Sequence, residues 1–236
     1  MVRSAIWKTI ADTLSEEIAA GHYRPGDKLP TEADLSRRFG VNRHTVRHAL
    51  AALAEAGTVH ARRGSGVYVS VVPADYPLGR RVRFHQNLLA TGRIPSRQLL
   101  SRATRAASTE EAEALGLSPG DEVHVIEGLS LADGVEIAHF RSVFPAARLP
   151  GLMPHLERLN SITAALTKAG VTDYTRASTR ITAQAANALM ALRLRLKEGA
   201  PLLKSVSVNV DGQGVPVEYG TTWFAGDRVT LTVAPD

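Results

Sequence analysis

Guanidinium groups are concentrated in one short part of this 236-residue chain. Residues 37–70 contain a single acid, Glu55. The same stretch contains six arginines: Arg37, Arg38, Arg43, Arg47, Arg62 and Arg63. Its formal charge therefore equals the whole chain's net charge of +5, and the remainder is balanced. A local basic patch on a neutral chain indicates a polyanionic partner such as DNA. The alternative is a basic face that contacts only solvent.

Two of these arginines are one helical turn apart in a segment that predicts an amphipathic helix over residues 43–56. Asn42 before it is a favourable N-cap residue. At about 100° per residue, the apolar side chains of the segment share one arc. The opposite arc carries Arg43, His44, Arg47 and His48. One face of this helix is therefore expected to pack, while the other offers guanidinium and imidazole groups.

The preceding segments favour a helix-turn-helix. A first helix is expected over residues 7–20, and a shorter one begins at Thr31 and stops at Gly40. Two helices joined by a tight turn, the second with a basic face, place that second helix in the major groove of DNA. Arg43 and Arg47 then pair with guanine or clamp phosphates.

Residues 58–60 and 67–69 alternate as two short strands, and the sequence RRGSG at 62–66 lies between them. This pattern predicts a basic hairpin, or wing, whose glycines let the backbone approach a phosphate closely. His44 and His48 also have the spacing of a helical zinc pair, but no third ligand is nearby in the sequence. We therefore expect no metal and no cofactor.

A second group of polar residues is suited to a small anion. Arg83, His85, Gln86 and Asn87 place a cation and hydrogen-bond donors near an expected helix start. Further candidates for this effector site are Arg141, Ser161, Arg180, Glu218 and Tyr219. The alternatives remain open. Arg141 and Arg180 alternate with apolar neighbours and so are equally compatible with a solvent-facing position, Ser161 with a helix cap, and Glu218 and Tyr219 with packing of the sheet.

The pattern of elements predicts two domains of α+β class. The winged helix-turn-helix takes residues 1–70, and a proline-containing linker without periodicity takes 71–82. Residues 83–236 read as an antiparallel sheet with helices, including hairpins around 133–134 and 211–214, a helix over 161–168, and a strand over 179–183 leading into a helix over 185–196.

Bulk features exclude several classes of protein. The chain has no cysteine, so disulfides and thiolate metal sites are impossible. The N-terminal residues lack the apolar core of a signal peptide, and no stretch approaches the roughly 20 apolar residues of a membrane helix. We expect a cytoplasmic protein without a membrane partner.

Three motifs together carry a specific resemblance: PGDKLPTE at 25–32, FGVNRHTVRHAL at 39–50 and RGSGVYV at 63–69. They closely resemble the GntR family of bacterial regulators. The resemblance implies that Arg43, His44, Thr45 and Arg47 occupy DNA-reading positions, and that Arg63 and Gly64 occupy the wing tip. Ala33 departs from the family, which often has a DNA-contacting arginine or asparagine there, so that contact is expected to be lost.

The second domain resembles the UTRA effector domain, which marks the HutC subfamily of GntR regulators and shares a fold with chorismate lyase. The resemblance rests on LSLADG at 129–134, LPGL at 149–152, APLL at 200–203 and PVEY at 216–219. It implies a dimer that binds a palindromic operator and responds to a small effector.

Shorter segments, YPL at 76–78, RFHQNLL at 83–89 and TRITA at 179–183, resemble the HutC-type regulators of phosphonate uptake and breakdown. Relatives that sense sugar phosphates carry two arginines on the strand before the Asp-Gly hairpin, where this chain has Gly128 and Ser130. The anion must then be held elsewhere, which favours a phosphonate or phosphate ester over an amino-sugar phosphate.

We therefore expect a DNA-binding repressor of phosphonate genes that is released by a small anion. The alternatives are a HutC-type regulator that senses a sugar phosphate or a histidine-pathway compound, an architectural DNA binder, and a lyase-like enzyme. The enzyme is disfavoured because the sequence shows no nucleophile-base pair or metal cluster.

Overall fold

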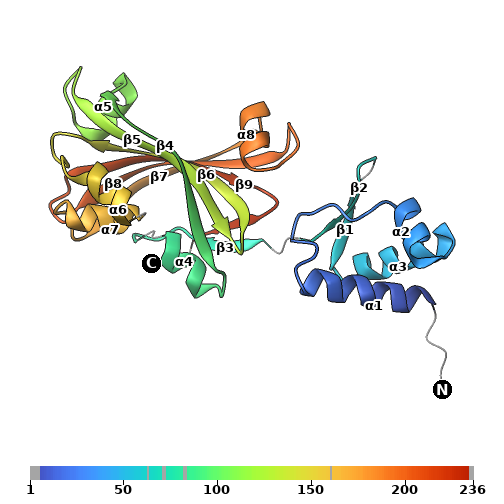
Figure 1. Ribbon diagram of the computed structural model, residues 1–236. Helices are drawn as coiled ribbons and strands as arrows, with labels where there is room; N and C mark the ends of the chain where they lie inside the picture. The colour runs from blue at the N-terminus through green and yellow to red at the C-terminus, as the bar shows by residue number, and fades with distance from the viewer. Residues whose placement is uncertain (1–5, 63, 71–72, 82–83, 160, 234–236) are drawn as a thin grey trace. The chain divides into compact units, whose positions relative to one another are not determined.

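The computed structural model describes residues 6–62, 64–70, 73–81, 84–159 and 161–233. The chain divides into two compact units, Met1–Val72 and Pro73–Asp236 (Figure 1). Each unit has its own buried apolar clusters. The expected α+β class and the two kinds of fold are confirmed.

The first unit consists of three helices and a two-stranded hairpin. These are α1 (Ile6–Ala19), α2 (Glu32–Phe39), α3 (Arg43–Glu55), β1 (Val59–Arg62) and β2 (Gly66–Val69). One core joins all five elements, and Leu14, Leu35 and Val46 in it are fully buried. The sequence determines the helix starts locally, because the side chains of Thr31 and Asn42 accept hydrogen bonds from the backbone three residues later.

The second unit is built on a six-stranded antiparallel sheet in the order β4-β5-β6-β9-β8-β7. Its elements are β3 (Ala74–Pro77), α4 (Phe84–Ala90), β4 (Pro95–Ala106), α5 (Thr109–Leu115), β5 (Glu122–Ala132), β6 (Val135–Pro145), α6 (Leu152–Leu159), α7 (Ile162–Lys168), β7 (Tyr174–Ala185), α8 (Ala188–Arg193), β8 (Pro201–Asp211), β9 (Pro216–Ala225) and β10 (Val229–Thr232). Strands β4 and β7 form the two edges.

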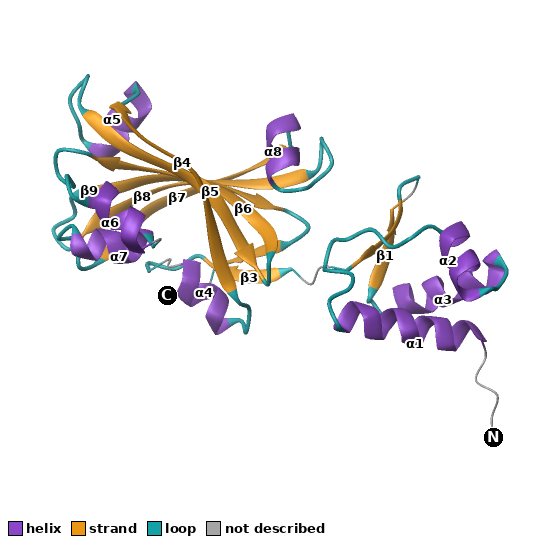
Figure 2. Cartoon of the chain, in the orientation of Figure 1, coloured by secondary structure: helices purple, strands orange, loops and turns teal. Residues whose placement is uncertain are grey.

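Both faces of this sheet are covered at their ends (Figure 2). On the first face, α6 and α7 pack at one end, and β3, β10 and α4 pack at the other. On the opposite face, α5 packs at one end and α8 at the other. Because successive side chains of a strand point to opposite faces, each central strand contributes to both middle regions.

The linker expected over 71–82 is corrected by strand β3. Residues 74–77 pair in parallel with β10, and Ala74 and Tyr76 are buried. The strand is too short to show a convincing alternation, and its proline lies at its end, where a missing N–H is tolerated. Residues 71, 72 and 82 lie outside the described part of the chain.

The expected boundary between a strand and a helix near residue 185 is also corrected. Strand β7 continues to Ala185, and α8 covers only Ala188–Arg193. Asn187 sets the start of the helix, because its side chain accepts a hydrogen bond from the backbone of Met190 at 2.9 Å. The helices and hairpins expected at 161–168, 133–134 and 211–214 are confirmed.

Gly128 in β5 is a position where a side chain does not fit. A Cβ there would lie 2.6 Å from the carbonyl oxygen of Gln98 and 2.8 Å from the ring of Phe140. We expect Gly128→Ala to lower the free energy of unfolding by about 1–3 kcal/mol, the usual cost of overpacking. Gly79→Ala is the control, because nothing lies within 4 Å of a Cβ at that position. Urea unfolding measures both, and equal stability of the two variants would contradict this packing.

Candidate DNA interface and ligand pocket

The exposed face of α3 carries the side chains expected to read DNA. Arg43, His44 and Arg47 are exposed, while Thr45 is half-buried. Both the backbone N–H and the hydroxyl of Thr45 donate to Oδ1 of Asn42, at 2.9 and 3.0 Å. The cap therefore orders the first turn, which presents the basic side chains.

Arg47 is held by a carboxylate on the preceding helix. Its Nε and Nη2 donate to the two carboxylate oxygens of Glu32 at 3.1 and 2.9 Å. This hydrogen bonding holds the pKa of Glu32 below its usual value. A guanidinium bound along one edge keeps Nη1 free, so Glu32 restricts the arginine to few rotamers and leaves a donor for DNA.

The wing and its surroundings are described in part. Gly64 has a φ of 70°, a left-handed conformation that favours glycine at the hairpin tip. Arg63 lies outside the described residues, and Ala33 is half-buried near the start of α2. His48 stacks on Trp7 with ring centroids 4.3 Å apart. Within the described residues, no three metal-ligating side chains come together.

A polar cavity of about 80 Å³ lies in the middle of the first face of the sheet. Strands β5, β6, β8 and β9 form its floor, while β3, α4 and α7 contribute Tyr76, Phe84 and Thr163. Its polar and charged lining includes Arg97, Arg176, Glu218, Asn209, Ser130 and Ser142. The cavity is far smaller than the roughly 300 Å³ or more of sites for drug-sized ligands.

Arg97 of edge strand β4 enters this cavity between aromatic rings. Its Cζ lies 4.9 Å from the ring centroids of both Phe84 and Phe140. Its Nε is buried and has no hydrogen-bond partner, and among the described residues no carboxylate forms an ion pair with it. Burial lowers the pKa of this arginine. Two cation–π contacts are thus its main compensation for lost hydration.

The side-chain amide of Asn209 forms hydrogen bonds with both Arg176 and Glu218 and so bridges them. Nε of Arg176 donates to Oδ1 of Asn209 at 2.8 Å, and Nδ2 of Asn209 donates to the carboxylate of Glu218 at 2.7 Å. Arg97, Arg176 and Glu218 all act electrostatically on the buried hydroxyl of Tyr76, whose pKa burial raises to about 12. The three charged groups therefore converge on one region.

Two hydroxyls add unused hydrogen-bonding capacity. Ser130 and Ser142 are 4% and 6% exposed and line the cavity. Among the described residues neither hydroxyl has a hydrogen-bond partner. Buried donors next to arginines without counter-ions are suited to an oxyanion.

The structure describes only part of the expected helix-start site, namely Gln86 and Asn87. Gln86 is exposed, and Nδ2 of Asn87 donates to the carbonyl of Pro77 at 3.1 Å, which ties α4 to β3. Arg83 lies outside the described residues, and the side chain of His85 is not described. The hydroxyl of Ser161 caps α7 by accepting from the N–H of Ala164. Of the seven expected effector residues whose side chains the structure describes, Glu218 alone lines the cavity.

Arg141, Arg180 and Tyr219 lie on the opposite face of the sheet. Nη2 of Arg141 donates to Glu111 at 2.5 Å, and Nε lies 3.8 Å from Glu127. Arg180 and Tyr219 line a separate hollow beside α5. These three residues therefore lie away from the cavity that holds Glu218. Strand alternation places Arg141 and Tyr219 there, and the register shift between Arg176 and Ser178 reverses the alternation of β7 before Arg180.

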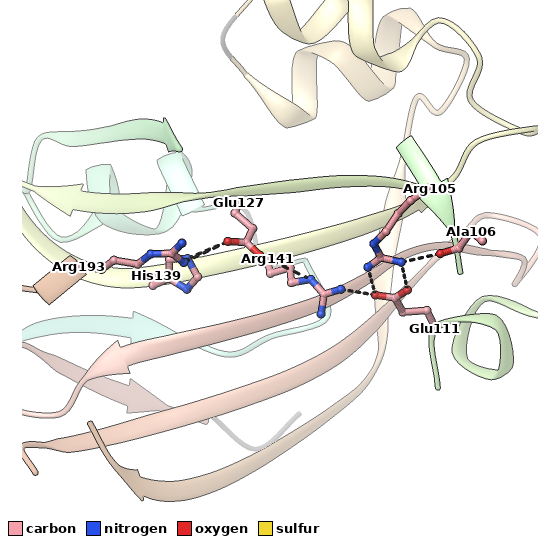
Figure 3. Close-up of polar contacts among 7 residues, drawn as sticks. All are labelled: Arg105, Ala106, Glu111, Glu127, His139, Arg141 and Arg193. Atoms are coloured by element: carbon pink, nitrogen blue, oxygen red, sulfur yellow. Dashed lines mark hydrogen bonds and ion pairs between the residues drawn. The ribbon is translucent and has the colours of Figure 1, made fainter. Parts of the chain in front are cut away.

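The ion pairs on this opposite face form a continuous row (Figure 3). Arg105 donates two hydrogen bonds to Glu111 at 2.8 Å, and Arg193 donates to Glu127 at 3.1 Å. Hydrogen bonding by Arg105, with contributions from Ser108 and Arg141, lowers the pKa of Glu111 to about 2. Burial and the neighbouring Arg193 lower the pKa of His139 to about 4. The arginines of this row are thus each paired with a carboxylate within the protein.

Sequence reasoning missed Arg97 and Arg176. Arg97 lies in β4, whose side chains are largely exposed because it is an edge strand, so no apolar alternation marks it. Arg176 precedes a register shift in β7, which breaks the period of two. One feature of the sequence pointed to this place. Gly128 and Ser130 stand where the resemblance led us to expect arginines, and Arg97 is the register partner of Ser130 on the neighbouring strand.

Comparison with known proteins gives two family matches. Residues 7–69 match the bacterial regulatory proteins of the gntR family, and residues 90–230 match the UTRA domain. The chain is 41% identical over 230 residues to an HTH-type transcriptional regulator of Rhizobium meliloti, covering 97% of this chain and 94% of the relative. It is 36% identical to the probable transcriptional regulator PhnF of Escherichia coli, covering 96% and 94% of the two chains.

A solved structure of a related regulator has a similar fold. The crystal structure of PhnF from Mycobacterium smegmatis aligns with a TM-score of 0.65 and 27% identity over 96% of this chain and 99% of that one. Among the described residues, no helix is both long and apolar enough to cross a membrane.

We expect Arg47→Ala to weaken operator binding by about 5- to 150-fold, because a bidentate contact to a base contributes about 1–3 kcal/mol. The operator is first selected from random DNA duplexes, and binding is then measured at physiological salt. Arg102→Ala in the second unit is the control for loss of one positive charge. Unchanged binding of Arg47→Ala would remove this residue from the interface.

We expect Glu111→Gln to be less stable than the native chain at neutral pH, with a difference that shrinks as the pH falls. The pKa of Glu111 is about 2 in the folded protein against 4.5 ordinarily, so its charged form stabilises the fold above pH 4.5. That contribution is lost between about pH 4.5 and 2. Urea unfolding at several pH values measures it.

Glu113→Gln on the same helix is the matched control, because Glu113 is exposed and forms no ion pair with any described residue. Its stability should stay within about 0.5 kcal/mol of the native chain. A difference for Glu111→Gln that is constant across the pH range would refute the proposed role of the ion-pair row.

Proposed function

The chain belongs to the GntR family of bacterial regulators and carries a UTRA domain of HutC type, and from this premise we propose that it is a repressor released from its operator by a small anion bound at Arg97 and Arg176. GntR-type regulators bind DNA operators and respond to small effectors, and the relatives are transcriptional regulators rather than enzymes. A chromosomal operator implies action in the cytoplasm.

The observation that carries this proposal is the pair of arginines that lack counter-ions in one cavity. Burying a guanidinium without a carboxylate is costly, and proteins compensate such charges by pairing. On the opposite face of the same sheet every arginine of the row in Figure 3 has a carboxylate nearby. An anionic ligand supplies the missing partner for Arg97 and Arg176.

A ligand in the cavity would contact strand β3, which follows the DNA-binding unit in the sequence. Tyr76 in β3 lines the cavity four residues after Val72, where the first unit ends. Its ring lies 6.4 Å from that of Phe84, which in turn stacks on Arg97. Ligand binding therefore changes the surroundings of the segment that leads directly into the DNA-binding unit, as an allosteric device requires.

The genes under control are proposed from resemblance. The segments at 76–78, 83–89 and 179–183 resemble HutC-type regulators of phosphonate uptake and breakdown. A cavity of about 80 Å³ favours a small phosphonate or phosphate ester over a sugar phosphate or a histidine-pathway compound. A relative in Mycolicibacterium smegmatis is named as the repressor PhnF. We further propose a homodimer on a palindromic operator, the usual arrangement for two winged helices.

We expect Arg97→Ala and Arg176→Ala to bind operator with native affinity but to lose release by effector. The anion would lose a charge-assisted hydrogen bond in each case, which weakens ligand binding by about tenfold or more. The effector is found by thermal-shift screening with alkylphosphonates, phosphate esters and sugar phosphates, and release is followed by fluorescence anisotropy of labelled operator.

Arg180→Ala is the matched control and should respond normally, because Arg180 lies on the opposite face. Arg97→Lys keeps a cation and should retain a partial response, which separates loss of charge from loss of folding. Normal release of Arg97→Ala, with loss of release in Arg180→Ala, would place the effector site on the other face of the sheet.

A further inference from the structure

The cavity contains a carboxylate as well as two guanidiniums, and among the described residues none of these three groups forms an ion pair within 4 Å with another, although the charge of Glu218 acts on Arg97. Glu218 accepts a hydrogen bond from Asn209 but forms no ion pair within the described residues. Asn209, only 5% exposed, occupies the position between Glu218 and Arg176 and satisfies each with a different end of its amide. The amide thereby holds the two opposite charges apart.

The carboxylate of Glu218 would not help the cavity to bind an anion that carries no positive group. A carboxylate that lines the cavity repels an incoming phosphonate or phosphate and so opposes the attraction of the arginines. The neutral lining groups Ser130, Ser142 and Tyr76 would recognise the anion without that penalty. Glu218 therefore indicates that the ligand carries a second, positive group.

We propose that the effector is a small zwitterion, with an anionic phosphonate or phosphate group at Arg97 and Arg176 and an ammonium group at Glu218. This inference rests on the proposed function and adds the chemical class of the effector. The ammonium donates to the carboxylate oxygen of Glu218 that Asn209 leaves unused. The small cavity limits the spacer between the two charges to a short carbon chain.

The two arginines and Glu218 would also distinguish a zwitterion from an anion that has no ammonium group. An alkylphosphonate of the same length but without nitrogen would leave Glu218 desolvated and unpaired, which is strongly unfavourable. Inorganic phosphate would satisfy only the arginine end. Glu218 is thus a specificity-determining residue, while Arg97 and Arg176 provide the affinity common to all anions.

The test compares two ligands that differ in one group, 2-aminoethylphosphonate and propylphosphonate, by calorimetry and by release of labelled operator. We expect the amino compound to bind the native protein about 10- to 100-fold more tightly. Glu218→Gln keeps an oxygen for Asn209 and should abolish this preference. Binding of propylphosphonate by the variant shows that the second unit and its cavity are folded, and Glu113→Gln, on the opposite face, should keep the preference.

The outcomes separate the two proposals. Equal binding of both ligands, weakened by Arg97→Ala, would refute the zwitterion and leave the anion effector standing. An unchanged preference in Glu218→Gln would also refute the role of Glu218. Failure of both ligands to bind or to release operator would overturn the zwitterion together with the phosphonate effector.

Discussion

Alternation of side chains along β6 and β9 is the constraint on which the second unit depends. Phe140 and Ser142 line the cavity, while Arg141 between them joins the ion-pair row on the other face. In β9, Glu218 and Tyr219 divide in the same way. One sheet therefore separates two charged environments by the thickness of a strand. Among the described residues, the two arginines of the cavity on the first face form no ion pair with a carboxylate, and those of the row on the second face do.

Because Gly128 has no side chain, there is room beside it for the ring of Phe140, which lines the cavity. A side chain there would collide with Gln98 and with the Phe140 ring. That ring lies instead within cation–π distance of Arg97, which reaches the cavity from the neighbouring strand. At this place the chain combines a glycine in β5, an aromatic ring in β6 and an arginine from the edge strand β4.

The DNA-binding unit was predictable because its signals are local. Caps at Thr31 and Asn42, the turn at Gly40 and the apolar stripe of α3 each act within a few residues, and each predicts an element boundary closely. The ligand pocket depends on partners far apart in sequence. Arg97, Arg176 and Glu218 meet only when the edge strands are in register, and the edges carry the weakest hydrophobic pattern. The proximity of Glu218 to these arginines could not be inferred from its own neighbours.

Strand β3 is the element through which the proposed effector would act on the first unit. A ligand shifts a conformational equilibrium only by its different affinities for the two states. The contacts that differ must then include residues whose position depends on the chain that leads to the first unit. Tyr76 and Phe84 are such residues, since β3 follows that unit directly and Asn87 ties α4 to β3. The guanidinium of Arg97 lies against the rings of Phe84 and Phe140. In the proposed mechanism, an anion that attracts this guanidinium would alter its contact with Phe84, and through Phe84 the packing of Tyr76 in β3.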